Sequence, residues 1–238
     1  MIENSAAEDK LARRHAQAPA EDEKVSKSAR AKADKLRRIK DAALGMFLTK
    51  GFDKATTRDI ARIADVANGT IFLYAANKRE LLFLLYNDEI ETAVNNSIAR
   101  IDRNADLKAN LMAVCHAHLG HFATKVDLAR FALKHLDMYT ANSQGLRFQQ
   151  IYRKIIARIV ELFAEAIAVQ ELRKDRTANQ MATMFFSLLK EELIRFVISE
   201  PPNLGESLAT LESQIDVLIA GLGAAHAITA DTPRERHS

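Results

Sequence analysis

The segment that most restricts the fold is residues 36–82, near the N-terminus of this 238-residue chain: LRRIKDAALGMFLTKGFDKATTRDIARIADVANGTIFLYAANKRELL. Its apolar residues recur at helical spacing, and two short breaks at Gly51 and Asp65 divide them. Gly adopts left-handed dihedrals freely, and Asp adopts them more readily than most residues, so both are predicted to end a helix. The segment therefore predicts three short helices joined by two tight turns.

Capping patterns indicate where these helices begin. Thr56 or Thr57 is predicted to cap the second helix, because Asp59 completes a loose capping-box pattern with Thr56. A third helix is predicted from residue 67 or 68 to 74. Asn77 and Glu80 form a second box-like start, which predicts a long fourth helix.

Two short helices joined by a tight turn form a helix-turn-helix, whose second helix meets DNA base edges with its N-terminal residues. An Asn side chain pairs bidentately with adenine, and a Thr methyl group can touch that of thymine. The residues predicted to face the groove are Asn68, Gly69, Thr70 and Leu73. The flanking residues predicted to contact phosphates, which fix register without reading sequence, are Thr57, Arg58, Tyr74 and Lys78.

These residues carry a family resemblance. The segment resembles the DNA-binding domain of the TetR/AcrR family of bacterial transcriptional regulators through Ala42-Ala43-x-x-x-Phe47, Lys50-Gly51-Phe52, Ala55-Thr56-Thr57-x-x-Ile60-Ala61, Gly69-Thr70-Ile71-Phe72 and Asn77-Lys78-x-x-Leu81. The resemblance implies an all-α fold of about nine helices. It also implies a transcriptional regulator, most often a repressor, that binds a palindromic operator in double-stranded DNA as a homodimer and is released by a small-molecule effector.

Four positions depart from the family pattern. Asp65 stands where the family has Gly, Ala67 where it has Ser, and Ala75 where it has an aromatic residue. Phe72, which is also predicted to lie at the DNA interface, replaces a Tyr whose hydroxyl often contacts phosphate. Tyr74 is a candidate replacement for that contact, although it leaves a different face of the helix.

The rest of the chain also favours helices, because it contains few Gly and Pro residues and no long alternating run of β-branched residues. We predict a disordered basic arm over 1–33, the helix-turn-helix domain over 34–80, an effector-binding and dimerisation domain over 81–227, and a disordered tail over 228–238. The arm has two interpretations: its Lys and Arg side chains follow DNA phosphates, or it is a solvated tail.

The sequence indicates no enzyme, cofactor or metal site. It lacks a phosphate-cradling Gly-rich loop and a nucleophile elbow. His116, His118 and His121 cluster beside Cys115 without the spacing of a converging ligand set, and Cys115 is expected to be a buried, inert thiol. No apolar stretch is long enough for a secretory signal or a membrane span, so a cytoplasmic protein without a membrane partner is expected.

The resemblance implies an effector pocket between the middle helices. The candidates that map there are His118, Phe122, Phe131, His135, Met138, Tyr139 and Tyr152. His118 and His135 fall on apolar helix faces, where a polar group needs a partner. Phe122 and Phe131 have the alternative interpretation of filled core, and the residues do not identify the effector.

Residues 181–197 carry apolar side chains on two sides of a helix, so both sides must be covered. The resemblance implies that the last two helices pair across a two-fold axis, and we predict a homodimer through residues 177–199 and 206–226. Burial within one subunit is the alternative. For the whole protein, the alternative to an effector-controlled regulator is a DNA-binding architectural protein without an effector.

Overall fold

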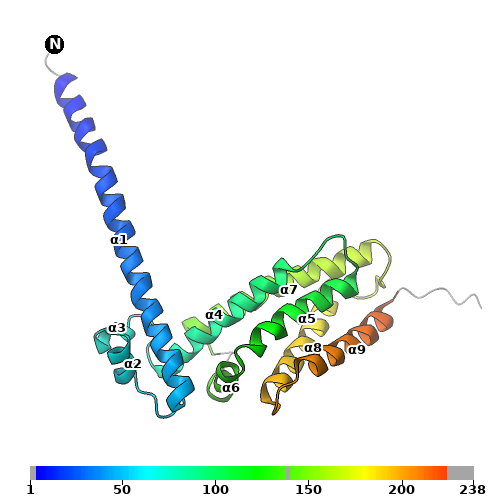
Figure 1. The fold of residues 1–238 in the computed structure, drawn as a ribbon. Coiled ribbons are helices and arrows are strands. Elements are labelled where there is room, and N and C mark those ends of the chain that lie inside the picture. The colour runs from blue at the N-terminus through cyan, green and yellow to red at the C-terminus, as the bar shows by residue number, and fades with distance from the viewer. Residues whose placement is uncertain (1–3, 138–139, 224–238) are drawn as a thin grey trace, which may run out of the picture. The chain divides into compact units, whose positions relative to one another are not determined.

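The computed structural model describes residues 4–137 and 140–223. In those residues the chain forms nine helices, as Figure 1 shows: α1 (Asn4–Lys50), α2 (Thr57–Ile63), α3 (Asn68–Ile71), α4 (Lys78–Ala99), α5 (Leu107–Ala123), α6 (Val126–His135), α7 (Ser143–Ala168), α8 (Ala178–Ile198) and α9 (Leu204–Leu222). The predicted all-α fold is confirmed. None of the described helices is long and apolar enough to cross a membrane.

The chain divides into two compact units, residues 1–85 and 86–238. The division falls within α4, which contributes its first two turns to the first unit and its remainder to the second. The boundary predicted after residue 80 also lies in this helix.

The first unit is built around apolar side chains of α1 that meet α2 and α3. The fully buried residues Ile39, Phe47, Ile60 and Ile71 form its centre. Both predicted turns have the expected backbone, with φ of 80° at Gly51 and 51° at Asp65. Phe52 folds back onto the end of α1, with its ring 5.3 Å from that of Phe47.

The predicted helix starts are confirmed. The Thr56 side chain caps α2 by accepting a hydrogen bond from the backbone N–H of Asp59. The Asn77 side chain accepts one from the backbone N–H of Glu80, and the Glu80 carboxylate accepts one from the backbone N–H of Ala76. These bonds satisfy backbone donors that a helix N-terminus otherwise leaves unpaired.

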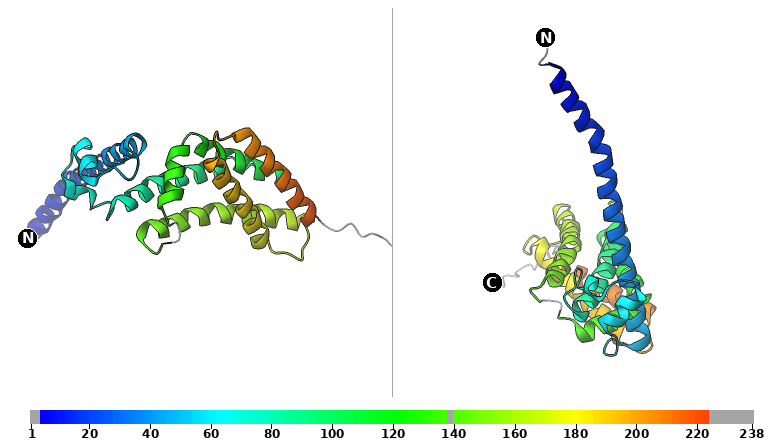
Figure 2. Two further views of the ribbon diagram at one scale, coloured as in Figure 1. Left: turned by 90° about the horizontal axis from the view of Figure 1, so that it is seen from below. Right: turned by 90° about the vertical axis from the view of Figure 1, so that its left-hand side faces the viewer.

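The N-terminal segment differs from the prediction of disorder over residues 1–33, because α1 begins at Asn4. The segment is rich in Ala, Lys, Glu and Arg, which have high intrinsic helix propensity, and this propensity favours a helix without an apolar face to bury. Figures 1 and 2 show that the N-terminal half of α1 projects away from α2 and α3. The predicted tail over 228–238 lies outside the described residues.

The second unit places α7 against α8, and α9 against both α5 and α8. Its core includes the fully buried Leu111, Phe122, Phe163 and Phe185. A buried polar contact is also present in this unit, since the buried Asn87 amide donates to the backbone carbonyl of Gln144 at 2.9 Å. This bond ties α4 to the start of α7.

Candidate DNA interface and effector pocket

The surface of α3 carries the side chains that the sequence predicts to face DNA. Asn68 and Gly69 are exposed, Thr70 is half-buried, and Leu73, which follows the helix, is 79% exposed. A Cβ atom added at Gly69 would meet nothing within 4 Å, so the backbone here is open to a close approach. Phe72 is 48% exposed and adds a second apolar side chain to this surface.

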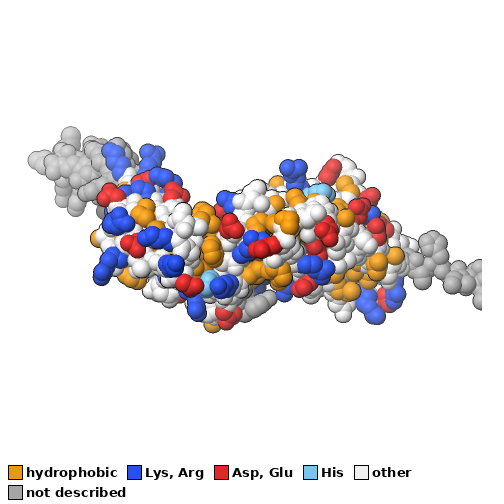
Figure 3. Space-filling view, turned by 60° about the horizontal axis from the view of Figure 1, so that its bottom comes forward, with side chains coloured by type: hydrophobic (Ala, Val, Ile, Leu, Met, Phe, Trp, Pro, Cys, Tyr) orange, Lys and Arg blue, Asp and Glu red, His pale blue; other side chains and the backbone are white. Residues whose placement is uncertain are grey.

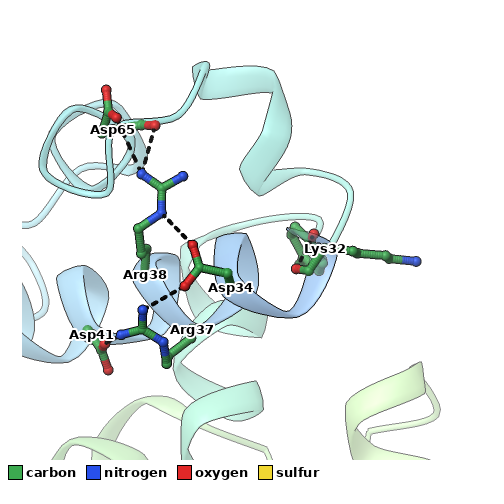
Figure 4. A network of polar contacts seen from close by, with 7 residues as sticks. Lys32, Asp34, Arg37, Arg38, Asp41 and Asp65 are labelled. Atoms are coloured by element: carbon green, nitrogen blue, oxygen red, sulfur yellow. Dashed lines mark hydrogen bonds and ion pairs between the residues drawn. The ribbon is translucent and has the colours of Figure 1, made fainter. Parts of the chain in front are cut away.

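The turn between α2 and α3 is held by α1. Arg38 donates from Nη1 to the backbone carbonyl oxygen of Asp65 at 3.3 Å and lies 3.3 Å from its carboxylate. Asp34 lies 3.5 Å from Nε of Arg38 and also pairs with Arg37. The guanidinium of Arg38 therefore contacts Asp34 on one side and Asp65 on the other, as Figure 4 shows. No local sequence pattern predicts this clamp, because Arg38 and Asp65 are far apart in the chain.

Two predicted phosphate contacts are engaged inside the unit instead. The Tyr74 hydroxyl donates its single proton to the backbone carbonyl of Lys32 at 3.2 Å, so it has none left to donate to a phosphate. Lys78 donates from Nζ to the carbonyls of Phe52 at 2.6 Å and Asp53 at 3.2 Å. Tyr74 and Lys78 therefore support the helix-turn-helix from within, and the Lys78 ammonium keeps a third N–H to donate. Arg58 remains exposed beside the half-buried Thr57.

The surface of the first unit is basic but not uniformly so. Figure 3 shows Lys and Arg side chains spread over this unit with Asp and Glu among them. Arg37 and Arg38 are paired with Asp34, Asp41 and Asp65. Lys32 and Lys35 are exposed on α1, and the backbone carbonyl of Lys32 accepts a hydrogen bond from Tyr74, which follows α3.

An apolar chamber of about 130 Å³ lies in the second unit. Helices α4, α6, α7 and α8 line it with Tyr86, Leu133, Phe148, Tyr152, Lys190, Leu193, Ile194 and Val197. Phe148, Tyr152 and Lys190 also line a neighbouring groove of about 370 Å³, which adds Gln149, Arg153, Ile156 and Phe186. The chamber and the groove therefore share lining residues. The groove carries two cationic side chains, Arg153 and Lys190.

Of the residues predicted for the effector pocket, Tyr152 lines both cavities. Phe122 is fully buried core, which is the alternative that the sequence left open. Phe131 and His135 are half-buried and line neither cavity. Met138 and Tyr139 lie outside the described residues. The α8 side of the chamber does not follow from the sequence pattern, because an apolar stripe on this helix equally predicts packing or dimerisation.

His118 packs behind the aromatic wall of the chamber. Its ring centre lies 6.3 Å from that of Tyr152 and 5.5 Å from that of Phe122. Among the described residues, its Nδ1 atom has no hydrogen-bond partner. Burial, with a smaller contribution from His121, lowers the pKa of His118 to about 4, so the ring is neutral at physiological pH. The neighbouring Cys115 is buried, which raises the pKa of its thiol to about 12 and makes it inert.

A row of ion pairs connects α4 to α7 and to α5. Nη2 of Arg147 lies 2.8 Å from Asp88 and 2.7 Å from Glu91, and Arg147 immediately precedes the chamber residue Phe148. Glu89 lies 2.8 Å from Nε2 of His121, and this contact, together with Lys125, lowers the pKa of that carboxyl. Phe148 at the chamber wall is therefore adjacent in sequence to a residue, Arg147, that contacts α4.

An open apolar groove of about 440 Å³ lies between α8 and α9. Its lining includes Met184, Leu188, Val217 and Leu222, of which Met184 is 52% and Val217 72% exposed. The opposite side of α8 is buried in the core through Phe185 and Leu189. The two apolar sides predicted for this helix are therefore present, one covered and one open.

Comparisons with known proteins agree with this architecture. The family model of the bacterial regulatory proteins of the tetR family matches residues 39–85. The fatty acid metabolism regulator protein of Bacillus subtilis (strain 168) is 23% identical over 192 residues, which span 80% of this chain and 97% of that relative.

Solved structures share the fold as well. The transcriptional regulator FadR from Bacillus subtilis in complex with stearoyl-CoA superposes with a TM-score of 0.61 and 22% identity, over 78% of this chain and 98% of that one. The fatty acid degradation regulator FadR from Bacillus halodurans gives a TM-score of 0.60 and 22% identity over the same shares. The helix-turn-helix, the nine described helices and these matches together support a TetR-family transcription regulator.

Proposed function

We propose that this protein is a cytoplasmic, homodimeric repressor that binds a palindromic operator and releases it when an acyl-CoA thioester binds to the second unit. The observation that carries the choice of ligand is the apolar chamber beside a groove with two cations, Arg153 and Lys190. A ligand pocket usually combines an apolar lining with a few polar groups that fix orientation.

The two cavities match the two ends of such a thioester. An acyl chain gains free energy by leaving water for the chamber, whose lining is almost entirely hydrocarbon. The phosphates of coenzyme A are attracted to Arg153 and Lys190 at the groove. The solved relative from Bacillus subtilis was crystallised with stearoyl-CoA, which supports this class of ligand.

For DNA we propose that α3 enters the major groove. Asn68 and Thr70 read base edges, and the exposed Phe72 and Leu73 contact thymine methyl groups. Gly69 lets the backbone approach the duplex, while Thr57 and Arg58 contact phosphates. The open groove between α8 and α9 is the proposed homodimer interface, and two-fold symmetry then presents two copies of α3 to the two halves of a palindrome.

Induction is proposed to pass through α4. An acyl chain that shifts Phe148 also shifts the adjacent Arg147, which holds α4 through Asp88 and Glu91. A change in the tilt of α4 moves each copy of α3 away from successive groove faces, which are roughly 34 Å apart. The ligand shifts this equilibrium only by its difference in affinity for the two arrangements.

The test is release of operator DNA by a panel of acyl-CoA thioesters, with free coenzyme A and the free fatty acids as controls. We expect only the intact thioesters to release the operator, because they alone occupy both cavities. Double substitution Arg153→Gln and Lys190→Gln should weaken release by thioesters and leave operator binding unchanged. Operator binding that is indifferent to every thioester would refute the proposal and favour an architectural DNA-binding protein.

A further inference from the structure

Tyr86 is one of three residues lining the chamber that carry a polar group, together with Tyr152 and Lys190. Its side chain is 4% exposed and lines the cavity from α4, close to Phe122. Within the part of the chain that the structure describes, the Tyr86 hydroxyl makes no hydrogen bond. Burial raises the pKa of Tyr86, so the hydroxyl stays protonated and keeps its proton to donate. A hydroxyl at an apolar cavity gains free energy from a hydrogen-bond partner, so a ligand oxygen that accepts from Tyr86 is favoured.

The position of Tyr86 determines which part of a bound ligand it meets. The groove shares Phe148, Tyr152 and Lys190 with the chamber, but Tyr86 lines the chamber alone. Leu193, Ile194 and Val197 belong to the same part of the cavity. A thioester whose charged end lies in the groove therefore brings its acyl chain, rather than its phosphates, to Tyr86.

The size of the chamber limits that chain. Its volume is about 130 Å³. An apolar cavity of roughly 150 Å³ holds one benzene molecule, so the chamber has room for about six carbon atoms. Interiors are close-packed and resist expansion, which disfavours a much longer chain.

We propose that the effector is a thioester with a short acyl chain that carries a hydroxyl or keto oxygen, and that Tyr86 recognises this oxygen. This inference rests on the proposed function, because it assumes that the thioester binds in the chamber. The oxygen of a hydroxyl or keto group on the acyl chain can accept a hydrogen bond from the Tyr86 hydroxyl. An unsubstituted chain leaves the Tyr86 hydroxyl unpaired and is discriminated against for that reason.

Calorimetric titration of the full-length protein tests the inference with four probes: hexanoyl-CoA, its 3-hydroxy and 5-hydroxy derivatives, and stearoyl-CoA. The wild type should bind one hydroxy derivative about 2- to 10-fold more tightly than hexanoyl-CoA. Tyr86→Phe removes only the hydroxyl and should abolish this preference while leaving the affinity for hexanoyl-CoA unchanged or higher. Its unfolding temperature should not fall, because the lost group has no partner among the described residues.

The outcomes separate this inference from the proposed function. Tighter binding of stearoyl-CoA than of every hexanoyl probe, unaffected by Tyr86→Phe, would overturn the inference and leave the proposed function standing. Equal weakening of all probes by Tyr86→Phe would assign Tyr86 to the thioester carbonyl and would also overturn it. Failure of every thioester to bind would refute the ligand class itself.

Discussion

Arg38 Nη1 lies 3.3 Å from the backbone carbonyl oxygen of Asp65, the residue whose positive φ forms the turn between α2 and α3. The turn is therefore held by a side chain of α1 rather than by its own sequence alone. Arg38 is half-buried, so the contact is only partly screened by solvent. It fixes the angle at which α3 leaves α2, and this angle determines how α3 meets a groove.

The backbone of this turn gives a stability prediction. Asp65→Ala and Asp65→Gly both remove the carboxylate, but only Ala keeps a Cβ atom in the left-handed conformation, which costs about 1 kcal/mol. Asp65→Ala should therefore lower the free energy of unfolding by about 1 kcal/mol more than Asp65→Gly. Urea unfolding of the two variants measures this difference. Equal stabilities would mean that the turn relaxes away from the positive φ.

Base reading by α3 gives a second prediction. Asn68 is exposed at the start of the helix and makes none of the side-chain hydrogen bonds found among the described residues, so its substitution should not disturb the fold. Asn68→Ala should cost about 1–3 kcal/mol in binding to operator DNA and much less in binding to random DNA. Fluorescence anisotropy with both duplexes measures the two losses, and equal losses would contradict base reading. Lys78→Met is the contrasting variant, because Lys78 supports the fold through Phe52 and should lower the unfolding temperature.

The buried His118 predicts a pH dependence of stability. Its pKa is about 4 in the folded protein, against about 6.5 in the unfolded chain. Between these values the unfolded chain binds the additional proton, so stability is complete above about pH 6.5 and falls as the pH is lowered to 4. The total loss should be roughly 3 kcal/mol.

The variant His118→Gln does not titrate in this range, so its stability should fall less over the same pH interval. Chemical unfolding of both proteins across that interval gives the comparison. Parallel curves for wild type and variant would show that His118 is not kept neutral by burial.

The proposed dimer interface is tested by two surface valines of equal exposure. Val217 in the groove between α8 and α9 is 72% exposed, and Val169 after α7 is 74% exposed. Val217→Glu should produce monomers, because a buried carboxylate without a partner opposes association. Val169→Glu should leave the oligomeric state unchanged. Sedimentation analysis distinguishes the species, and a dimeric Val217→Glu protein would place the interface elsewhere.

Local patterns were sufficient to predict the turns and helix starts of the first unit. The caps at Thr56 and Asn77, the turns at Gly51 and Asp65, and the contact of Phe52 with the end of α1 depend on residues a few positions apart. Interactions over such distances are encoded in spacing and residue type. The internal contacts of Tyr74 and Lys78 join residues that are distant in the chain, and no spacing rule predicts them.

The effector pocket was predicted less completely for a physical reason. Periodicity shows that a residue faces inward, but it does not show whether the space beside that residue is filled. Phe122 and Tyr152 have similar positions in their apolar stripes, yet Phe122 is packed core and Tyr152 lines the chamber. The α8 contribution of Leu193 and Val197 was missed because an apolar side chain gives the same signal in a core, a pocket wall or an interface.

The central claim is that one thioester site and one DNA-reading surface are coupled through α4. Titration of an acyl-CoA thioester that releases the operator, with and without saturating operator DNA, tests it most directly. Because coupling between two binding sites is reciprocal, operator DNA should weaken thioester binding by the same factor by which the thioester weakens operator binding. Identical thioester affinities in the two titrations would contradict the account.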